Sequence, residues 1–139
     1  MTAKDYLLSI QYERKQIDRL KKRKDGLKLN YSGISGIDYT RDRVQSNPTN
    51  ALENAAWDLL ERIERIDNEI IDMVLDIENK LDEIQGMENP NYSEILYRCY
   101  AEGKSLKEVS IELECDYNNL TRIHKKALQA FESKYLISA

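Results

Sequence analysis

The sequence is poor in glycine and proline, the residues that most often interrupt helices, and poor in aromatic side chains. Its 139 residues include five Gly and two Pro, aromatic residues make up 8%, and charged residues make up 33%. A sandwich of sheets needs many turns, and an α/β enzyme needs a large apolar core, so this composition suits neither class. It predicts an all-α protein with modest cores.

Long apolar runs and metal-spaced cysteines are also lacking. No run approaches the roughly 18 apolar residues of a membrane span, and the first residues lack the apolar core of a signal peptide. Cys99 and Cys115 match no metal-ligand spacing, and we expect reduced thiols. These absences predict a cytoplasmic protein without a membrane partner, metal or cofactor.

The residues that catalysis usually requires are scarce as well. His124 is the only histidine, so a Ser–His or Cys–His pair would depend on it; we expect it on the surface or near phosphate. The carboxylates between residues 53 and 88 alternate with apolar residues, which is typical of a solvated helix face. No glycine-rich phosphate loop is present. The sequence therefore predicts a protein that is not an enzyme.

Charge is distributed unevenly along the chain. The net charge of −4 argues against nucleic-acid binding, but residues 1–45 contain 11 Lys and Arg against 6 Asp and Glu. Residues 51–89 contain 3 against 12, and residues 117–139 contain 4 against 1. Only the basic end segments could approach phosphate, so the segments are expected to have different roles.

The first helix is expected from Thr2 to Asp25, with Gly26 as its stop. The basic run at 21–24 would then close the helix, where positive charge is favourable, and a DNA-backbone contact is the alternative. Residues 27–49 are expected to form a flexible loop, which is long for a compact domain and is either partly disordered or functional.

A near-heptad apolar seam marks a long second helix that begins after Thr49 or Asn50 and ends at Gly86. Its members are Leu52, Ala56, Leu59, Ile63, Ile66, Ile70, Val74, Ile77, Leu81 and Ile84. The 3,4 spacing breaks once, between Ile70 and Val74. Such a seam must be buried, and the first helix would cover it as an antiparallel hairpin. The second helix is longer, so its remainder would contact the C-terminal unit or a second subunit in a homo-oligomer.

Three shorter helices are expected from Asn89 onward. Asn89-Pro90 opens the first, which ends at Gly103. Ser105 and Glu108 form a capping box that opens the second. Their apolar faces are Tyr92, Ile95, Leu96, Cys99 and Tyr100 in the first helix, and Leu106, Val109 and Leu113 in the second.

A three-residue turn at 114–116 leads to the last helix, which Asp116 caps. Its inner face is Leu120, Ile123, Ala127, Leu128 and Phe131. A short helix, a tight turn and a longer basic helix form the helix-turn-helix plan, and Ser110 lies where the two helices need a small residue. Glu114 replaces the usual turn glycine, at a cost of roughly 1 kcal/mol for a left-handed conformation.

The outward face of the last helix is polar and basic. It is expected to contain Tyr117, Asn118, Asn119, Thr121, Arg122, Lys125 and Lys126. Asn can pair bidentately with adenine and Arg with guanine, while Lys and Tyr can reach phosphates. These seven residues are the candidate DNA-binding site, because no acidic residue lies between 117 and 131.

Residues 105–128 resemble the −35-reading C-terminal region of sigma-70-type factors, most specifically in the pattern Leu120-x-x-Ile123-x-x-x-Ala127-Leu128. Almost the whole chain resembles phage and prophage late-transcription regulators of the RinA/ArpU type, through its N-terminal helix, Gly/Ser/Asn loop, long acidic helix and Tyr92-x-x-Ile-Leu-x-x-x-Tyr100. The resemblance to sigma-70-type factors implies base contacts from Tyr117, Asn118, Thr121 and Arg122. Because Tyr117-Asn118-Asn119 replaces the usual Arg-Glu-Arg, the −35 sequence itself is not the expected target.

The sequence thus predicts a helical hairpin over 1–88 and a helix-turn-helix DNA-binding domain over 89–139. The expected function is regulation, most simply activation, of phage or prophage transcription in a bacterial cytoplasm, with double-stranded DNA and host RNA polymerase as partners. Two alternatives remain open at this point: the DNA-recognising small subunit of a phage terminase, and a coiled-coil adaptor that does not bind DNA.

Overall fold

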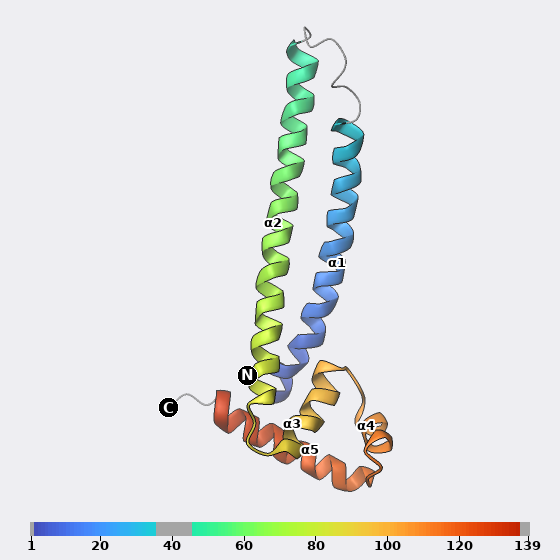
Figure 1. Ribbon diagram of the computed structural model, residues 1–139, viewed down its shortest axis with the longest axis vertical. Coiled ribbons are helices and arrows are strands. Elements are labelled where there is room, and N and C mark those ends of the chain that lie inside the picture. Colours follow the sequence, from blue (N-terminus) through green and yellow to red (C-terminus); the bar gives the residue numbers. More distant parts are fainter. Residues whose placement is uncertain (1, 36–45, 137–139) are drawn as a thin grey trace. The chain divides into compact units, whose positions relative to one another are not determined.

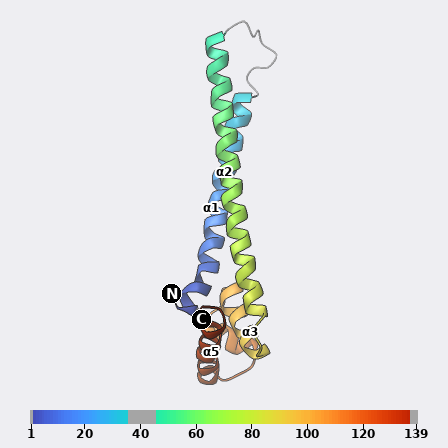
Figure 2. The same cartoon turned by 90° about the vertical axis from the view of Figure 1, so that its left-hand side faces the viewer.

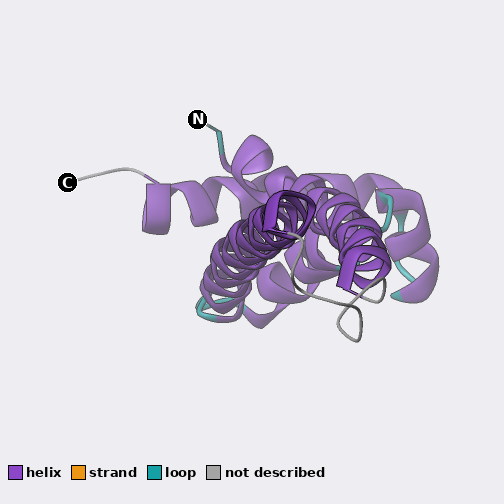
Figure 3. Cartoon of the chain, turned by 90° about the horizontal axis from the view of Figure 1, so that it is seen from above, coloured by secondary structure: helices purple, strands orange, loops and turns teal. Residues whose placement is uncertain are grey.

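The computed structural model describes residues 2–35 and 46–136, and every regular element in these ranges is helical (Figure 3). The all-α prediction is confirmed. The described residues form five α-helices (Figure 1): α1 Ala3–Ser35, α2 Ser46–Gln85, α3 Pro90–Leu96, α4 Leu106–Glu112 and α5 Tyr117–Phe131. Single π-helical turns follow α3 and α5, namely η1 Tyr97–Ala101 and η2 Glu132–Leu136. None of the described helices has the length and apolar character that a membrane span requires.

The chain divides into two compact units. Unit 1 comprises Met1–Lys15 and Val74–Ala139, and unit 2 comprises Gln16–Met73. The expected boundary between residues 88 and 89 does not coincide with this division. The first turns of α1 and the last turns of α2 belong with the C-terminal helices because they share one core, in which Leu7, Ile10 and Ile84 are fully buried.

The predicted end of the first helix at Asp25 is wrong. α1 continues through Gly26 to Ser35, and α2 begins at Ser46, so the predicted loop at 27–49 is helical at both its ends. A glycine inside a helix costs only about 1 kcal/mol relative to alanine, which favourable neighbours can outweigh. Pro48 lies in the first turn of α2, where a backbone N–H has no helical partner anyway. The rest of that loop, 36–45, lies outside the described residues.

Unit 2 consists of two antiparallel helical segments that lie side by side in both views (Figures 1 and 2). Ile17 on α1 and Ala56 and Ile66 on α2 are buried there. Lys24 pairs with Asp67, with 2.5 Å between Nζ and Oδ1. The predicted hairpin packing is therefore present in this unit.

The buried face of α2 follows a more regular heptad than the apolar residues alone predict. From Leu52 to Ile70 the predicted members are buried or half-buried, but Val74 is 41% exposed. The face continues instead through Met73, Ile77, Lys80, Ile84 and Met87. The predicted irregularity after Ile70 is wrong, because Met73 rather than Val74 continues the buried face, and a lysine occupies a later seam position.

Lys80 is 6% exposed and is held by groups from α1 and α2 within unit 1. Its ammonium group lies 2.5 Å from Ser9 Oγ, 2.9 Å from Glu13 Oε1 and 2.6 Å from Asp76 Oδ2. It also lies 4.9 Å from the centre of the Tyr6 ring. A buried cation needs such compensation, since desolvating it alone would be very costly.

The end of η1 is satisfied by side chains of α1. Gln11 Nε2 donates to the carbonyl oxygens of Tyr100, at 2.9 Å, and Ala101, at 3.1 Å, and Arg14 donates to the latter. Carbonyl groups at a helix end lack helical hydrogen-bond partners, and here the side chains of α1 supply the missing donors. Gly103 follows with φ of 72°, and a Cβ there would lie 3.3 Å from the Gln11 side chain. The predicted stop at Gly103 is confirmed.

Candidate nucleic-acid interface

The N-termini of α3, α4 and α5 are each capped by the predicted side chain. Asn89 Oδ1 accepts from the Asn91 amide at 2.9 Å, and Ser105 Oγ accepts from the Glu108 amide at 3.2 Å. The Glu108 carboxylate accepts the Ser105 hydroxyl at 3.2 Å instead of completing the capping box at the backbone. Asp116 Oδ2 accepts from the Asn119 amide at 3.1 Å.

One small core holds α3, α4 and α5 together in unit 1. Ile95, Val109 and Leu120, one from each helix, are buried at its centre. Half-buried residues surround them: Cys99, Leu106, Leu113, Cys115 and Ile123. The predicted apolar faces of these helices therefore do meet.

The turn between α4 and α5 adopts the left-handed geometry that the sequence predicts. Glu114 has φ of 53° and is the only described non-glycine residue with positive φ. Its amide donates to the Ile111 carbonyl at 3.2 Å, and the Cys115 amide donates to the Ser110 carbonyl at 3.0 Å. These two bonds form the Schellman motif, which satisfies the last carbonyls of α4. Ser110 is buried, as its predicted place between the helices requires.

The inner face of α5 fixes which side of the helix is presented to solvent. Leu120, Ala127 and Phe131 are at most 1% exposed. The seven predicted site residues are all exposed on the described surface: Tyr117, Asn118, Asn119, Thr121, Arg122, Lys125 and Lys126. The structure thus brings the whole predicted set onto the exposed part of one helix.

Three of these side chains form hydrogen bonds within the helix. Arg122 Nη2 donates to Asn119 Oδ1 at 3.2 Å, and Thr121 Oγ1 donates to the Tyr117 carbonyl at 2.9 Å. Asn118 lies four residues before Arg122, on the same side of the helix, but the hydrogen-bond partner of Arg122 is Asn119. Among the described residues, Asn118, Lys125 and Lys126 have no hydrogen bond or ion pair, so their polar groups are available to a ligand.

The sequence predicts His124 on the surface or near phosphate, whereas the structure places its ring half-buried against another side chain. The ring is half-buried and stacks on Tyr100, with 2.9 Å between His124 Nε2 and the Tyr100 hydroxyl oxygen. Burial lowers the pKa of His124, and the nearby Lys4 ammonium lowers that pKa further. Half-buried, hydrogen-bonded to Tyr100 and with a lowered pKa, His124 packs on the inner side of α5 as a neutral ring at neutral pH.

Glu112, at the end of α4, is neutralised by two basic side chains. Glu112 on α4 accepts from Arg98 at 2.6 Å and from Lys104 at 2.6 Å. These two cations lower the pKa of the Glu112 carboxyl. Arg98 also pairs with Glu94, and Lys104 with Glu102. This cluster was not predicted from the sequence, although the four-residue spacing of Glu94 and Arg98 indicates an ion pair on one helix face.

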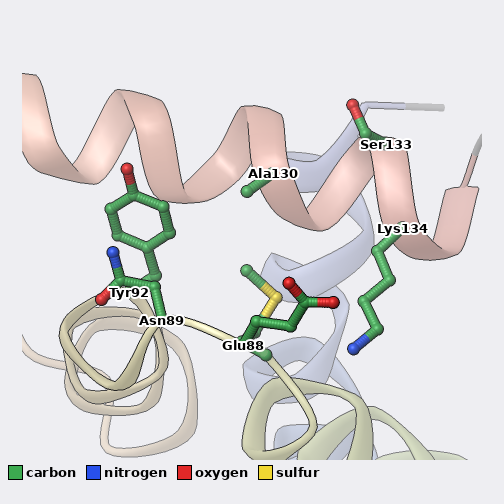
Figure 4. Close-up of a pocket in the computed structure, with 7 residues that line it drawn as sticks. Glu88, Asn89, Tyr92, Ala130, Ser133 and Lys134 are labelled. Atoms are coloured by element: carbon green, nitrogen blue, oxygen red, sulfur yellow. The ribbon is translucent and has the colours of Figure 1, made fainter.

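A separate hollow of about 440 Å³ lies between the start of α3 and the end of the α5–η2 segment (Figure 4). Its lining consists of Met87, Glu88, Asn89, Tyr92, Ala130, Ser133 and Lys134. Lys134 is engaged with the Gly86 carbonyl at 2.5 Å. The lining contains no histidine, cysteine or aspartate. Among the described residues, no group of three or more His, Cys, Asp or Glu side chains could hold a metal ion. Nothing in this hollow forms a nucleophile–base pair.

The outward face of α5 has the chemistry that a duplex accepts. An amide and a guanidinium can each make two hydrogen bonds to a base edge, and ammonium groups can reach phosphates. Comparisons of the chain with protein-family models, curated proteins and solved structures give no match. The side chains of α5 therefore provide the functional evidence.

Proposed function

We propose that the protein is a sequence-specific DNA-binding regulator of transcription that inserts α5 into the major groove. The observation that carries the proposal is the exposed face of α5, where seven polar or basic side chains lie on a helix whose opposite face is buried. No acidic residue occurs from Tyr117 to Phe131. A helix anchored in this way after a tight turn matches the geometry of a recognition helix.

The regulated process that we propose is transcription of phage or prophage genes. Support comes from the resemblance of residues 105–128 to the −35-reading region of sigma-70-type factors, and of the chain to RinA/ArpU-type regulators. Activation through host RNA polymerase, and self-association through the hairpin, belong to the same proposal. The replaced opening, Tyr117-Asn118-Asn119, indicates a target other than the −35 sequence.

The bonds on α5 suggest different roles for its side chains. Asn118 is free to read a base edge, and we assign it to adenine. Arg122 can read guanine after exchanging its bond to Asn119 for the base. Lys125 and Lys126, one turn further along and unpaired, are assigned to phosphates, which fix position and carry no sequence information.

The proposal is tested by selecting binding sites from randomised duplexes at one fixed salt concentration. Wild type, Asn118→Ala and Arg122→Ala should return related motifs, with preference relaxed at one or two positions in each variant. Each loss should cost roughly 1–3 kcal/mol on the preferred site and less on random DNA. Lys28→Ala, at an exposed site on α1, is the matched control and should return the wild-type motif. Identical motifs from all four proteins, or no motif from wild type, would contradict base reading by α5 and favour a protein-binding adaptor.

Charge reversal at Lys125 and Lys126 tests the phosphate contacts separately. Affinity should fall about equally for every duplex, and the slope of log affinity against log salt should flatten by about 0.9 for each lost contact. An unchanged slope would remove these two lysines from the interface.

A further inference from the structure

Three arginines from two helices surround one small hollow in unit 2. Arg23 comes from α1, and Arg62 and Arg65 come from α2. The buried Ile66 and the carboxylate-bearing Glu69 complete the lining of a space of about 70 Å³. We call this feature the arginine hollow. Its volume is comparable with that of about two water molecules in the liquid, at about 30 Å³ each.

The arginine hollow is positively charged, although α2, which supplies two of its arginines, is mainly acidic. α2 contains eleven acidic residues and three basic ones, and the third basic residue is the buried Lys80. Both exposed basic residues of α2 therefore line the same hollow and face another arginine. Like charges brought together in this way repel one another unless an anion lies between them.

Pairing inside the protein neutralises only part of this charge. Arg62 Nε donates to Asp58 Oδ2 at 2.9 Å, on the exposed surface. Arg23 and Arg65 have no hydrogen bond or ion pair among the described residues, and Glu69 is not paired with either. A helix-dipole role for Arg23 is also excluded, because α1 continues past it to Ser35.

We propose that the arginine hollow binds a phosphate group of a nucleic-acid backbone. A guanidinium presents its N–H donors as a planar fork that matches phosphate oxygens, and two unpaired forks can approach one phosphate from both helices. The proposal concerns a second nucleic-acid contact on unit 2, separate from the face of α5. It does not depend on α5 reading bases.

The test compares two double variants of the full chain that remove the same charge. Arg23→Gln/Arg65→Gln empties the hollow of its unpaired guanidiniums, whereas Lys21→Gln/Lys28→Gln removes two exposed charges from α1. At 100° per residue, Lys21 and Lys28 point to the opposite side of α1 from Arg23. Affinity for a duplex of fixed sequence is measured over a series of salt concentrations.

The hollow variant should bind roughly tenfold to a hundredfold more weakly, as expected for losing charged hydrogen bonds. Its log–log salt slope should be smaller by about 1. The control variant should lose less than about threefold, from long-range attraction alone. Equal losses in the two variants, or no loss in the hollow variant, would overturn the proposal. Both variants should fold, because the substituted side chains are exposed. Thermal melting of both variants checks this.

A second arm separates a nucleic-acid phosphate from a free one. Inorganic phosphate is raised at constant ionic strength, and melting is followed for wild type and the hollow variant. A ligand of the folded state raises the melting temperature by mass action. If phosphate stabilises only wild type while DNA affinity is equal in both proteins, the hollow binds a free anion and the nucleic-acid proposal is wrong.

The two proposed DNA contacts fail in different ways. If the hollow variant binds like wild type while Arg122→Ala alters the selected motif, only the hollow proposal fails. If the hollow variant loses affinity while wild type selects no motif, the role of α5 fails and the hollow proposal stands. If the full chain binds no duplex at any salt concentration, both fail.

Discussion

Replacing Lys80 with methionine tests whether a buried cation holds α1 and α2 together in unit 1. Methionine has similar length and fills the same space, so packing is largely kept. What is lost is the ammonium group between Glu13, at 2.9 Å, and Asp76, at 2.6 Å. The variant would leave two carboxylates facing each other with no cation between them.

The size of the loss follows from how far the carboxylates are buried. Removing one partner of a buried ion pair typically costs about 3–5 kcal/mol. The Glu13 side chain is 15% exposed, but the Asp76 side chain is 49% exposed and keeps much of its water. We therefore expect Lys80→Met to lower the free energy of unfolding by about 2–3 kcal/mol at pH 7.5, below the fully buried range.

The loss should depend on pH because one carboxyl can accept a proton. Burial raises the pKa of Glu13, and the hydrogen bond with Asp76 raises that pKa further and lowers the pKa of Asp76. Because the pKa of Glu13 is raised in the folded state, protonation of Glu13 stabilises the folded protein, and this stabilisation is complete below the usual pKa of 4.5. This stability is lost as pH rises through the folded pKa. Lys80 lowers the pKa of Glu13, so its removal raises that pKa further in the variant, and the deficit of the variant should grow from pH 5 to pH 8.

Urea unfolding followed by circular dichroism, at pH 5 and pH 8, measures this deficit. Glu13→Gln/Lys80→Met keeps a hydrogen-bond donor to Asp76 and removes the repulsion, so it should recover part of the stability and lose the pH dependence. Lys28→Met, at an exposed and unpaired lysine, is the control and should change stability by less than about 0.5 kcal/mol. If Lys80→Met is as stable as wild type at pH 8, or its deficit is equal at both pH values, the explanation is wrong.

Three further outcomes are expected. Replacing Ile66 and Ile70 with Asp should cost several kcal/mol and lower the helical content, because charge enters a buried face; unchanged melting and sedimentation would contradict burial of that face. Burial raises the pKa of Cys99 to about 11, so in a Cys115→Ser background its alkylation at pH 8 should be slow until urea unfolds the protein. Fast alkylation of the folded protein would contradict this. His124 should titrate below its usual 6.5 by NMR, and its contribution to stability, complete above pH 6.5, should fall as pH drops below that value; a higher pKa would refute its burial.

Local signals predicted the C-terminal helices well. Asn89, Ser105 and Asp116 each cap a helix through a bond to an amide two or three residues away, so the sequence alone contains both partners. The exposure of the seven α5 residues was also predictable, because their spacing places them away from Leu120 and its apolar neighbours. Their role in DNA binding stays a prediction.

Features that depend on distant partners were not predictable. Gly26 was a reasonable stop, yet its small penalty did not outweigh the helix on either side. The burial of Lys80 was not predictable, because its partners Ser9 and Glu13 lie about seventy positions away in the sequence. The arginine hollow likewise joins Arg23 to residues of another helix, and no local pattern announces it.

The left-handed conformation of Glu114 lowers the stability of the fold, and a single substitution could remove this cost. Only the backbone of this exposed residue is constrained, since its amide completes the cap of α4 and its side chain forms no bond among the described residues. Glycine adopts this conformation without the roughly 1 kcal/mol penalty, and asparagine adopts it with less strain than glutamate. In a library of random variants challenged by heat, Glu114→Gly and Glu114→Asn should be among the first to be enriched. A protein stabilised in this way could tolerate destabilising mutations in α5, so changes to the exposed face of that helix could accumulate without loss of the fold.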